Sequence, residues 1–198
     1  MGQAQNAIPI VVKLKDLHVF SHKKQCPLKP EVKKGLKLII ENLKEQGLLI
    51  PCNSPYNTPI LGIKKSNGKW RLVQDLQIIN EAVVPLHPMV PNPYTLLSEI
   101  PEQAKYFSVI PLKDAFYSVP LAEESQFPFA FEDPTQPASQ LTWTVLPQGF
   151  RDSLHLFGQF VTGSTNFNSS EAVVLQYVDD ILLCARQRKL VHKPQKIS

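Results

Sequence analysis

Two adjacent carboxylates are the residues of this 198-residue chain best suited to metal chemistry. Asp179 and Asp180 lie between the apolar runs 172–175 and 181–185. Two apolar runs separated by a short polar break predict antiparallel strands joined by a turn. Such a turn either exposes both carboxylates to water or fixes them at a sheet edge, where hard oxygen ligands suit Mg²⁺. These residues alone leave both interpretations open.

A basic hairpin is the second feature whose residues could take part in chemistry. In "KKSNGKWRLVQDL", residues 64–76, Asn67 and Gly68 form a turn dipeptide between two strand-like segments. The cations near its tip are Lys64, Lys65, Lys69 and Arg71. Lysine neutralises phosphate charge, and the arginine fork grips phosphate with two hydrogen bonds. The alternative is a solvated basic surface.

The elements that must position these groups follow from hydrophobic periodicity. Residues 1–28 show no sustained period and predict an extended arm, whereas "PEVKKGLKLIIENLKEQG" predicts an amphipathic helix from Pro30 to a stop at Gly47. A short helix is expected within 94–100, strands within 127–132 and 140–150, and a helix within 151–163. The stretch 108–116 predicts a buried strand with Pro111 in its middle. The expected fold class is therefore α+β with antiparallel sheet.

Composition excludes several classes. The chain has 43% hydrophobic residues, 18 prolines against eight glycines, and a net charge of +4, so it suits a globular protein with long extended connections. Three distant cysteines without a CxxC pair argue for reduced thiols, an intracellular and cytoplasmic location, and no zinc site. No apolar run reaches the ~18 residues of a membrane span, and no Gly-rich phosphate loop is present.

Six motifs, in order, resemble the fingers and palm of a retroviral reverse transcriptase of the gammaretroviral type, including endogenous copies. They are "SPYNTPILGIKK", "VQDL", "VPNPYTLL", "LKDAFYSV", "QLTWTVLPQGF" and "LQYVDDILL". The resemblance covers about residues 25–185. It implies an incomplete right-hand polymerase with an arm at 1–28, a fingers-like region at 29–100, a partial palm at 101–185 with the Tyr-Val-Asp-Asp hairpin, and a disordered basic tail at 186–198.

The resemblance also implies roles for individual residues. Asp179 and Asp180 match the catalytic, Mg²⁺-binding pair, of which the first is a metal ligand. The residues that match the family's deoxynucleotide-binding positions are Lys65, Arg71, Asp114, Ala115, Phe116 and Gln148. Among these, Gln148 packs against the incoming nucleotide, Phe116 excludes a ribose 2′-hydroxyl, and Lys64 competes with Lys65 for the triphosphate.

Several positions depart from the family pattern. Pro111 stands where the second strand should supply a metal-binding aspartate, and Asp114, across a turn, is a poor substitute. A proline inside the strand should also weaken the sheet. Gln77 replaces an arginine beside the template, and Leu154 replaces a proline. The thumb and later domains have no counterpart in the sequence, so we expect a chain without polymerase activity.

Three functional hypotheses remain at this point. The chain is an RNA-directed DNA polymerase by descent that is catalytically inactive, with RNA or DNA template-primer and dNTP as ligands. Alternatively, it is a non-enzymatic fragment that binds nucleic acid or pairs with a related polymerase subunit. The third hypothesis is an unstable relic without function. The sequence separates the first from active polymerases through Pro111 but does not separate the second from the third.

Overall fold

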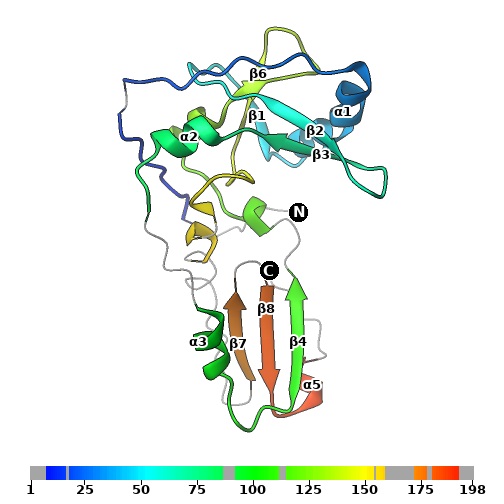
Figure 1. The fold of residues 1–198 in the computed structure, drawn as a ribbon, viewed down its shortest axis with the longest axis vertical. Coiled ribbons are helices and arrows are strands. Elements are labelled where there is room, and N and C mark those ends of the chain that lie inside the picture. The colour runs from blue at the N-terminus through cyan, green and yellow to red at the C-terminus, as the bar shows by residue number, and fades with distance from the viewer. Residues whose placement is uncertain are drawn as a thin grey trace. The chain divides into compact units, whose positions relative to one another are not determined.

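The chain forms two compact units (Figure 1). The first unit combines residues 1–85 with 116–153, and the second combines 86–115 with 154–198. The computed structural model describes residues 8–16, 18–86, 92–111, 115–153, 155–158, 172–177 and 180–191. Helices and antiparallel strands occur in both units, which confirms the predicted α+β class.

Helix α1 (Pro30–Glu45) begins and ends as its sequence predicts. Pro30 at the first position has no N–H to leave unpaired, and Glu31 suits the positive end of the helix dipole. At the other end Gly47 has φ +69°, and the N–H groups of Gly47 and Leu48 donate to the carbonyls of Lys44 and Leu43. This left-handed cap favours glycine because a Cβ would be strained there.

The buried face of α1 packs on the hairpin formed by β2 (Ile60–Lys64) and β3 (Trp70–Gln74). The two strands pair antiparallel from Ile60 with Gln74 to Lys64 with Trp70, so the predicted hairpin is confirmed. A Cβ on Gly35 would overlap the Trp70 indole. Glycine at position 35 therefore allows the aromatic ring to lie directly on the helix backbone.

A three-stranded sheet of order β1-β6-β5 completes the first unit, with strands β1 (Leu49–Cys52), β5 (Phe131–Glu132) and β6 (Gln140–Trp143). Beside it lie α2 (Gln77–Ala82) and the 3₁₀ turns η1 (Ala115–Ser118), η2 (Glu123–Ser125) and η3 (Phe127–Phe129). The strand predicted over 127–132 is thus too long. Residues 127–129 form η3 because Pro128 fixes φ and has no N–H for a strand ladder.

The arm at residues 8–28 is tied to several separate parts of the first unit. Isolated bridges pair Ile10 with Leu121 in parallel and Leu14 with Val83 antiparallel. Further along, Gln25 exchanges two side-chain hydrogen bonds with the backbone of Ile60, at 2.8 and 3.0 Å. These bonds pair backbone groups that the sheets leave unpaired.

Asp133 joins α1 to the turn between β5 and β6. Its carboxylate is 1% exposed and accepts from Lys44 Nζ at 2.9 Å and from Thr135 Oγ1 at 2.6 Å. Burial acts to raise the pKa of Asp133, but the hydrogen bonds from Thr135 and Lys44 outweigh it, so the pKa is lowered. The ionised form is therefore favoured in the folded protein.

Replacing Asp133 by Asn should lower the free energy of unfolding at pH 7 by about 1–3 kcal/mol, since the buried acceptor loses its charge. Because the folded-state pKa is depressed, this stabilisation is present above the ordinary aspartate pKa of about 3.9 and is lost as the pH falls below it. Urea unfolding of both proteins at pH 7 and pH 3.5 measures the difference. An equal difference at both pH values would contradict the charge-based account.

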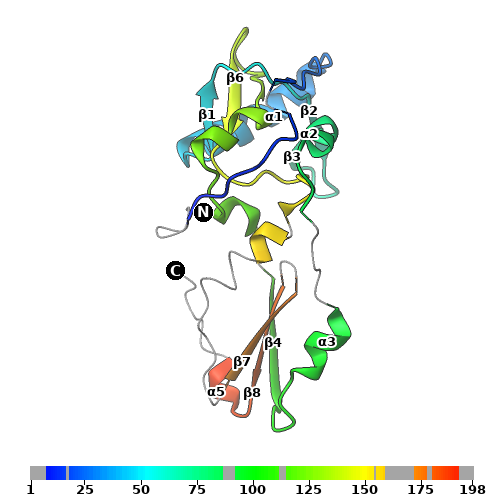
Figure 2. The ribbon, with the colours of Figure 1, turned by 90° about the vertical axis from the view of Figure 1, so that its left-hand side faces the viewer.

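The second unit is built on a three-stranded sheet of order β4-β8-β7 (Figure 1), with strands β4 (Tyr106–Pro111), β7 (Ala172–Tyr177) and β8 (Asp180–Ala185). Figure 2 shows this sheet from the side. One face carries an apolar cluster in which Leu183 and Ala185 of β8 pack with Val191. Helix α3 (Pro93–Ser98) contacts β7, and α5 (Arg188–Val191) contacts β8 and β4. The sequence predicted no structure after residue 185; α5 forms because Val191 enters this cluster.

Strand β4 differs from its prediction in two respects. The stretch was expected to be buried, but Phe107 is 52% and Val109 63% exposed. Pro111 is the last residue of an edge strand and lies opposite Asp180, whereas the sequence placed it in mid-strand. A missing N–H costs least at such a position, so we expect Pro111 to weaken the sheet less than a proline in mid-strand would.

Candidate functional site

The predicted cations of the first unit lie at or near the tip of the β2–β3 hairpin. Lys65 N donates to Lys69 O at 2.8 Å, and Gly68 at φ +78° closes the turn. Lys64 is engaged elsewhere: its Nζ lies 3.3 Å from Glu31 Oε1 and 5.8 Å from the centre of the Trp70 ring. Both contacts hold the Lys64 ammonium on the α1 side of the hairpin.

Two predicted nucleotide-binding residues meet directly. Arg71 Nη2 donates to Gln148 Oε1 at 2.8 Å, although the two residues are 77 positions apart in the sequence. Arg71 is exposed and belongs to β3, while Gln148 follows β6 in the segment Pro147-Gln148-Gly149. The bond leaves other guanidinium donors of Arg71 available, since arginine has five N–H groups.

The turn that carries Gln148 is held by a residue that sequence reasoning missed. Asn80 of α2 donates from Nδ2 to Gly149 O at 3.1 Å and accepts at Oδ1 from Arg151 N at 2.9 Å. Gly149 adopts φ +93°, a conformation that favours glycine. No local spacing signal links Asn80 to this turn, because the contact spans about seventy residues.

Beneath this turn, a buried glutamine joins the hairpin to the sheet. Gln74, the last residue of β3, donates to Thr58 Oγ1 at 2.6 Å and to Phe129 O at 2.9 Å. Its Oε1 accepts from Trp143 Nε1 at 2.8 Å. Each polar atom of the Gln74 amide is therefore paired inside the core.

Gln74→Leu should lower the free energy of unfolding by about 2–4 kcal/mol, because it leaves the buried indole N–H and the Phe129 carbonyl without hydrogen-bond partners. Chemical denaturation monitored by tryptophan fluorescence measures this loss. The matched control is Gln77→Leu on exposed α2, which should change stability by less than about 0.5 kcal/mol. Equal effects of the two variants would contradict the assigned role of the buried amide.

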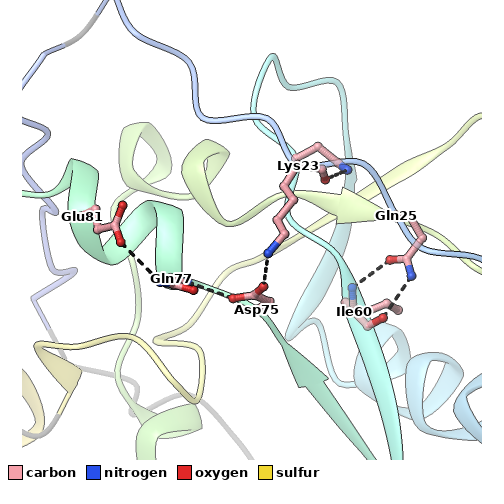
Figure 3. Close-up of polar contacts among 7 residues, drawn as sticks. Lys23, Gln25, Ile60, Asp75, Gln77 and Glu81 are labelled. Atoms are coloured by element: carbon pink, nitrogen blue, oxygen red, sulfur yellow. Dashed lines mark hydrogen bonds and ion pairs between the residues drawn. The ribbon is translucent and has the colours of Figure 1, made fainter.

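An open groove of about 610 Å³ lies beside the turn. Its lining includes apolar Leu61 and Val73, and the polar groups of Asp75, Gln77, Asn80, Glu81, Gly149 and Arg151. One wall is a chain of polar contacts shown in Figure 3. There Lys23 Nζ lies 2.7 Å from Asp75 Oδ2, and Asp75 Oδ1 accepts from Gln77 N at 3.2 Å.

The contact with Lys23 shifts the titration of both partners. The hydrogen bond from Lys23, followed by that from the Gln77 amide, lowers the pKa of Asp75, and the same partner raises the pKa of Lys23. Both groups are thus charged across the neutral range. Lys23 of the arm therefore pairs with Asp75, one of the two acids that line the groove.

In the second unit, the β7–β8 hairpin ends at the pair Tyr177 and Asp180. Asp180 is the first residue of β8, is exposed, and lies between Tyr177 and Pro111 on neighbouring strands. Asp179 and Asp114 lie outside the described residues. The backbone register therefore places position 111 beside Asp180, one of the two predicted carboxylates.

This register allows a test of the expected Mg²⁺ site. A cage that uses two strands needs an oxygen donor on each, and proline offers none from its side chain at position 111. Among the described residues, no group of three or more His, Cys, Asp or Glu could hold a metal ion. On the β4 side of this register, position 111 therefore contributes no side-chain oxygen.

The predicted site residues thus fall into two groups. Lys65, Arg71, Phe116 and Gln148 belong to the first unit, and Pro111, Asp179 and Asp180 belong to the second. Phe116 is half-buried in η1, and the structure describes the backbone of Ala115 at the start of the same turn. Of these residues, Arg71 and Gln148 are joined by a hydrogen bond, and Pro111 and Asp180 by strand pairing.

Comparison with known proteins identifies the family to which this architecture belongs. Residues 63–197 match the model of the reverse transcriptase (RNA-dependent DNA polymerase) family. The chain therefore belongs to this family, and the resemblance found in its motifs is confirmed.

Its relatives include retroviral polyproteins. The chain is 45% identical to the Gag-Pol polyprotein of baboon endogenous virus (strain M7) over 96% of its own length and 11% of that protein. It is 43% identical to the Pol polyprotein of feline endogenous virus ECE1 over 93% of its length and 18% of that protein, and 43% identical to the Gag-Pol polyprotein of koala retrovirus over 93% and 11%. The chain thus spans less than a fifth of each relative. Within its described part, no helix is long and apolar enough to cross a membrane.

Proposed function

We propose that the chain is the fingers and partial palm of an endogenous-retroviral RNA-directed DNA polymerase, which binds nucleotide and template but has lost nucleotidyl transfer. The observation that carries the proposal is the strand register that pairs Pro111 with Asp180. Free thiols, of which burial raises the pKa of Cys52 to about 11, support an intracellular location.

The first unit supplies the nucleotide-binding part. Arg71 lies in the hairpin that carries Lys65, and its bond to Gln148 sets the guanidinium against the turn after β6. A triphosphate would meet charge-assisted hydrogen bonds from Arg71 and Lys65. The engagement of Lys64 with Glu31 and Trp70 favours Lys65 over Lys64 for this role.

The groove beside the same turn suits a template nucleotide. Leu61 and Val73 offer an apolar floor for a base, and Arg151 offers a cation for the backbone. Gln77 Nε2 lies 3.5 Å from Glu81 Oε1, so this side chain gives the groove hydrogen-bonding groups but no positive charge. We therefore expect weaker template affinity than an arginine at position 77 would give.

The second unit supplies an incomplete metal-binding part. Nucleotidyl transfer with two metal ions needs anionic oxygens that converge from more than one strand. Here Asp179 and Asp180 provide oxygens on one side, and the strand opposite presents Pro111. Loss of several kcal/mol of charge stabilisation corresponds to a decrease of at least about a thousandfold in the rate of nucleotidyl transfer.

Primer extension tests this loss. With poly(rA)/oligo(dT) and Mg²⁺ or Mn²⁺, the chain should incorporate no dTTP above the buffer background, because one side of the cage is missing. Incorporation that Asp179→Asn abolishes would show that the chain is an active polymerase and would overturn the proposal.

Metal binding provides the matched control for this experiment. Pro111→Asp should bind Mn²⁺, measured by electron paramagnetic resonance, at least about tenfold more tightly than Pro111→Asn, which differs only by the charge. Equal affinity of the two variants would show that position 111 does not face the metal.

A non-enzymatic role is the second candidate, and two observations favour it. The exposed face of β4, with Phe107 and Val109, suits a partner polymerase, and the cationic hairpin suits RNA. Every buried side-chain nitrogen or oxygen of the described residues has a hydrogen-bond partner, as in folded proteins generally.

The affinity for single-stranded RNA should fall steeply with salt, with a log–log slope that decreases by about 0.7 for each phosphate contact removed. The double variant Lys65→Gln/Lys69→Gln should therefore lose about 1.4 from the slope measured by fluorescence anisotropy. The control is Lys37→Gln, which removes a cation that pairs with Glu41 on exposed α1. If control and double variant change the slope equally, the hairpin is not the RNA-binding surface.

A further inference from the structure

We propose that Asn80 is a positioning residue for nucleotide binding, acting through the turn that carries Gln148. The inference rests on the proposed function of Arg71 and Gln148, and it assigns to Asn80, which lines the groove beside the turn, an effect on dTTP binding that acts through Gln148. It follows from two hydrogen bonds that a single side chain makes to one turn.

The Asn80 carboxamide contacts the turn on both sides of Phe150. Its Nδ2 donates to the carbonyl of Gly149, and its Oδ1 accepts from the amide of Arg151. The turn's own backbone supplies little in their place, since the bond from Phe150 N to Pro147 O is 3.5 Å long. The asparagine side chain therefore substitutes for backbone pairing across this segment.

The two hydrogen bonds from Asn80 to Gly149 and Arg151 form a clamp, and the elements at both of its ends are anchored in the core. Ile79, the neighbour of Asn80, is fully buried, and Asn80 N donates to Leu76 O at 2.8 Å within α2. On the other side Phe150 is buried and meets Phe129 edge to face, with ring centres 5.2 Å apart. Neither anchor moves easily, so the two bonds fix Gly149 relative to α2.

The clamp determines the position of Gln148. Gly149 at φ +93° has the wide conformational freedom of glycine, and without a clamp its backbone can relax to other values. Such a change would rotate the adjacent Gln148 and separate its Oε1 from Arg71 Nη2. The clamp needs a short side chain that donates to the Gly149 carbonyl and accepts from the Arg151 amide. Asp offers two acceptors and no donor, and Ala offers neither.

The test is a double-mutant cycle on the full chain with dTTP and Mg²⁺, by isothermal titration calorimetry. Asn80→Ala and Asn80→Asp should each weaken dTTP binding about tenfold, the cost of an unmade hydrogen-bond pair. In a Gln148→Ala background, Asn80→Ala should weaken binding less than about twofold further, since residues that act through one another are not additive. Additive effects, or no effect of Asn80→Ala, would overturn the proposal.

Two controls separate positioning from folding and from failure of the proposed function. Asn42→Ala on the exposed face of α1 should leave dTTP affinity unchanged, and the far-ultraviolet circular dichroism spectrum of Asn80→Ala should match that of the parent chain. If the parent chain does not bind dTTP, the proposed function fails, and the clamp is judged by nuclear magnetic resonance. Altered Gln148 side-chain amide signals and faster Arg151 amide exchange in Asn80→Ala support the clamp, and unchanged signals refute it.

Discussion

The buried amide of Gln74 is the contact on which the arrangement of the first unit depends. It ends β3 and pairs with Thr58, Phe129 and Trp143, groups that come from three other parts of the chain. Buried polar groups stabilise a fold only when fully paired, and here the pairing selects one position of the hairpin relative to β6. That position brings Arg71 of the hairpin to Gln148 after β6.

The second unit depends on a different constraint, the register of β4 with β8. Antiparallel pairing leaves no freedom in which residue faces Asp180, and that residue is Pro111. Because the proline ends an edge strand, its missing N–H costs less than it would in mid-strand. On the other side of β8, strand β7 pairs from Ala172 with Ala185 to Tyr177 with Asp180.

The two units differ in what surrounds their candidate site residues. In the first, polar contacts that run from Lys23 in the arm through Asp75 to the Gln77 amide lie along one wall of a groove beside the Gln148 turn. In the second, an apolar cluster around Leu183 lies on the sheet in which Asp180 pairs with Pro111. Membership of the reverse transcriptase family accounts for the shared framework.

Helix α1, the β2–β3 hairpin and the family were predictable from sequence, because periodicity, a Gly47 cap, an Asn67-Gly68 turn and ordered motifs are local signals. The burial of β4, the 3₁₀ turn at Pro128 and the helix at 188–191 were not, since each depends on which elements pack against it. The Asn80 clamp and the Arg71–Gln148 bond join residues about seventy positions apart. Sequence determined which side chains are present, and tertiary packing decided which of them meet, because hydrogen bonds act over about 3 Å regardless of separation along the chain.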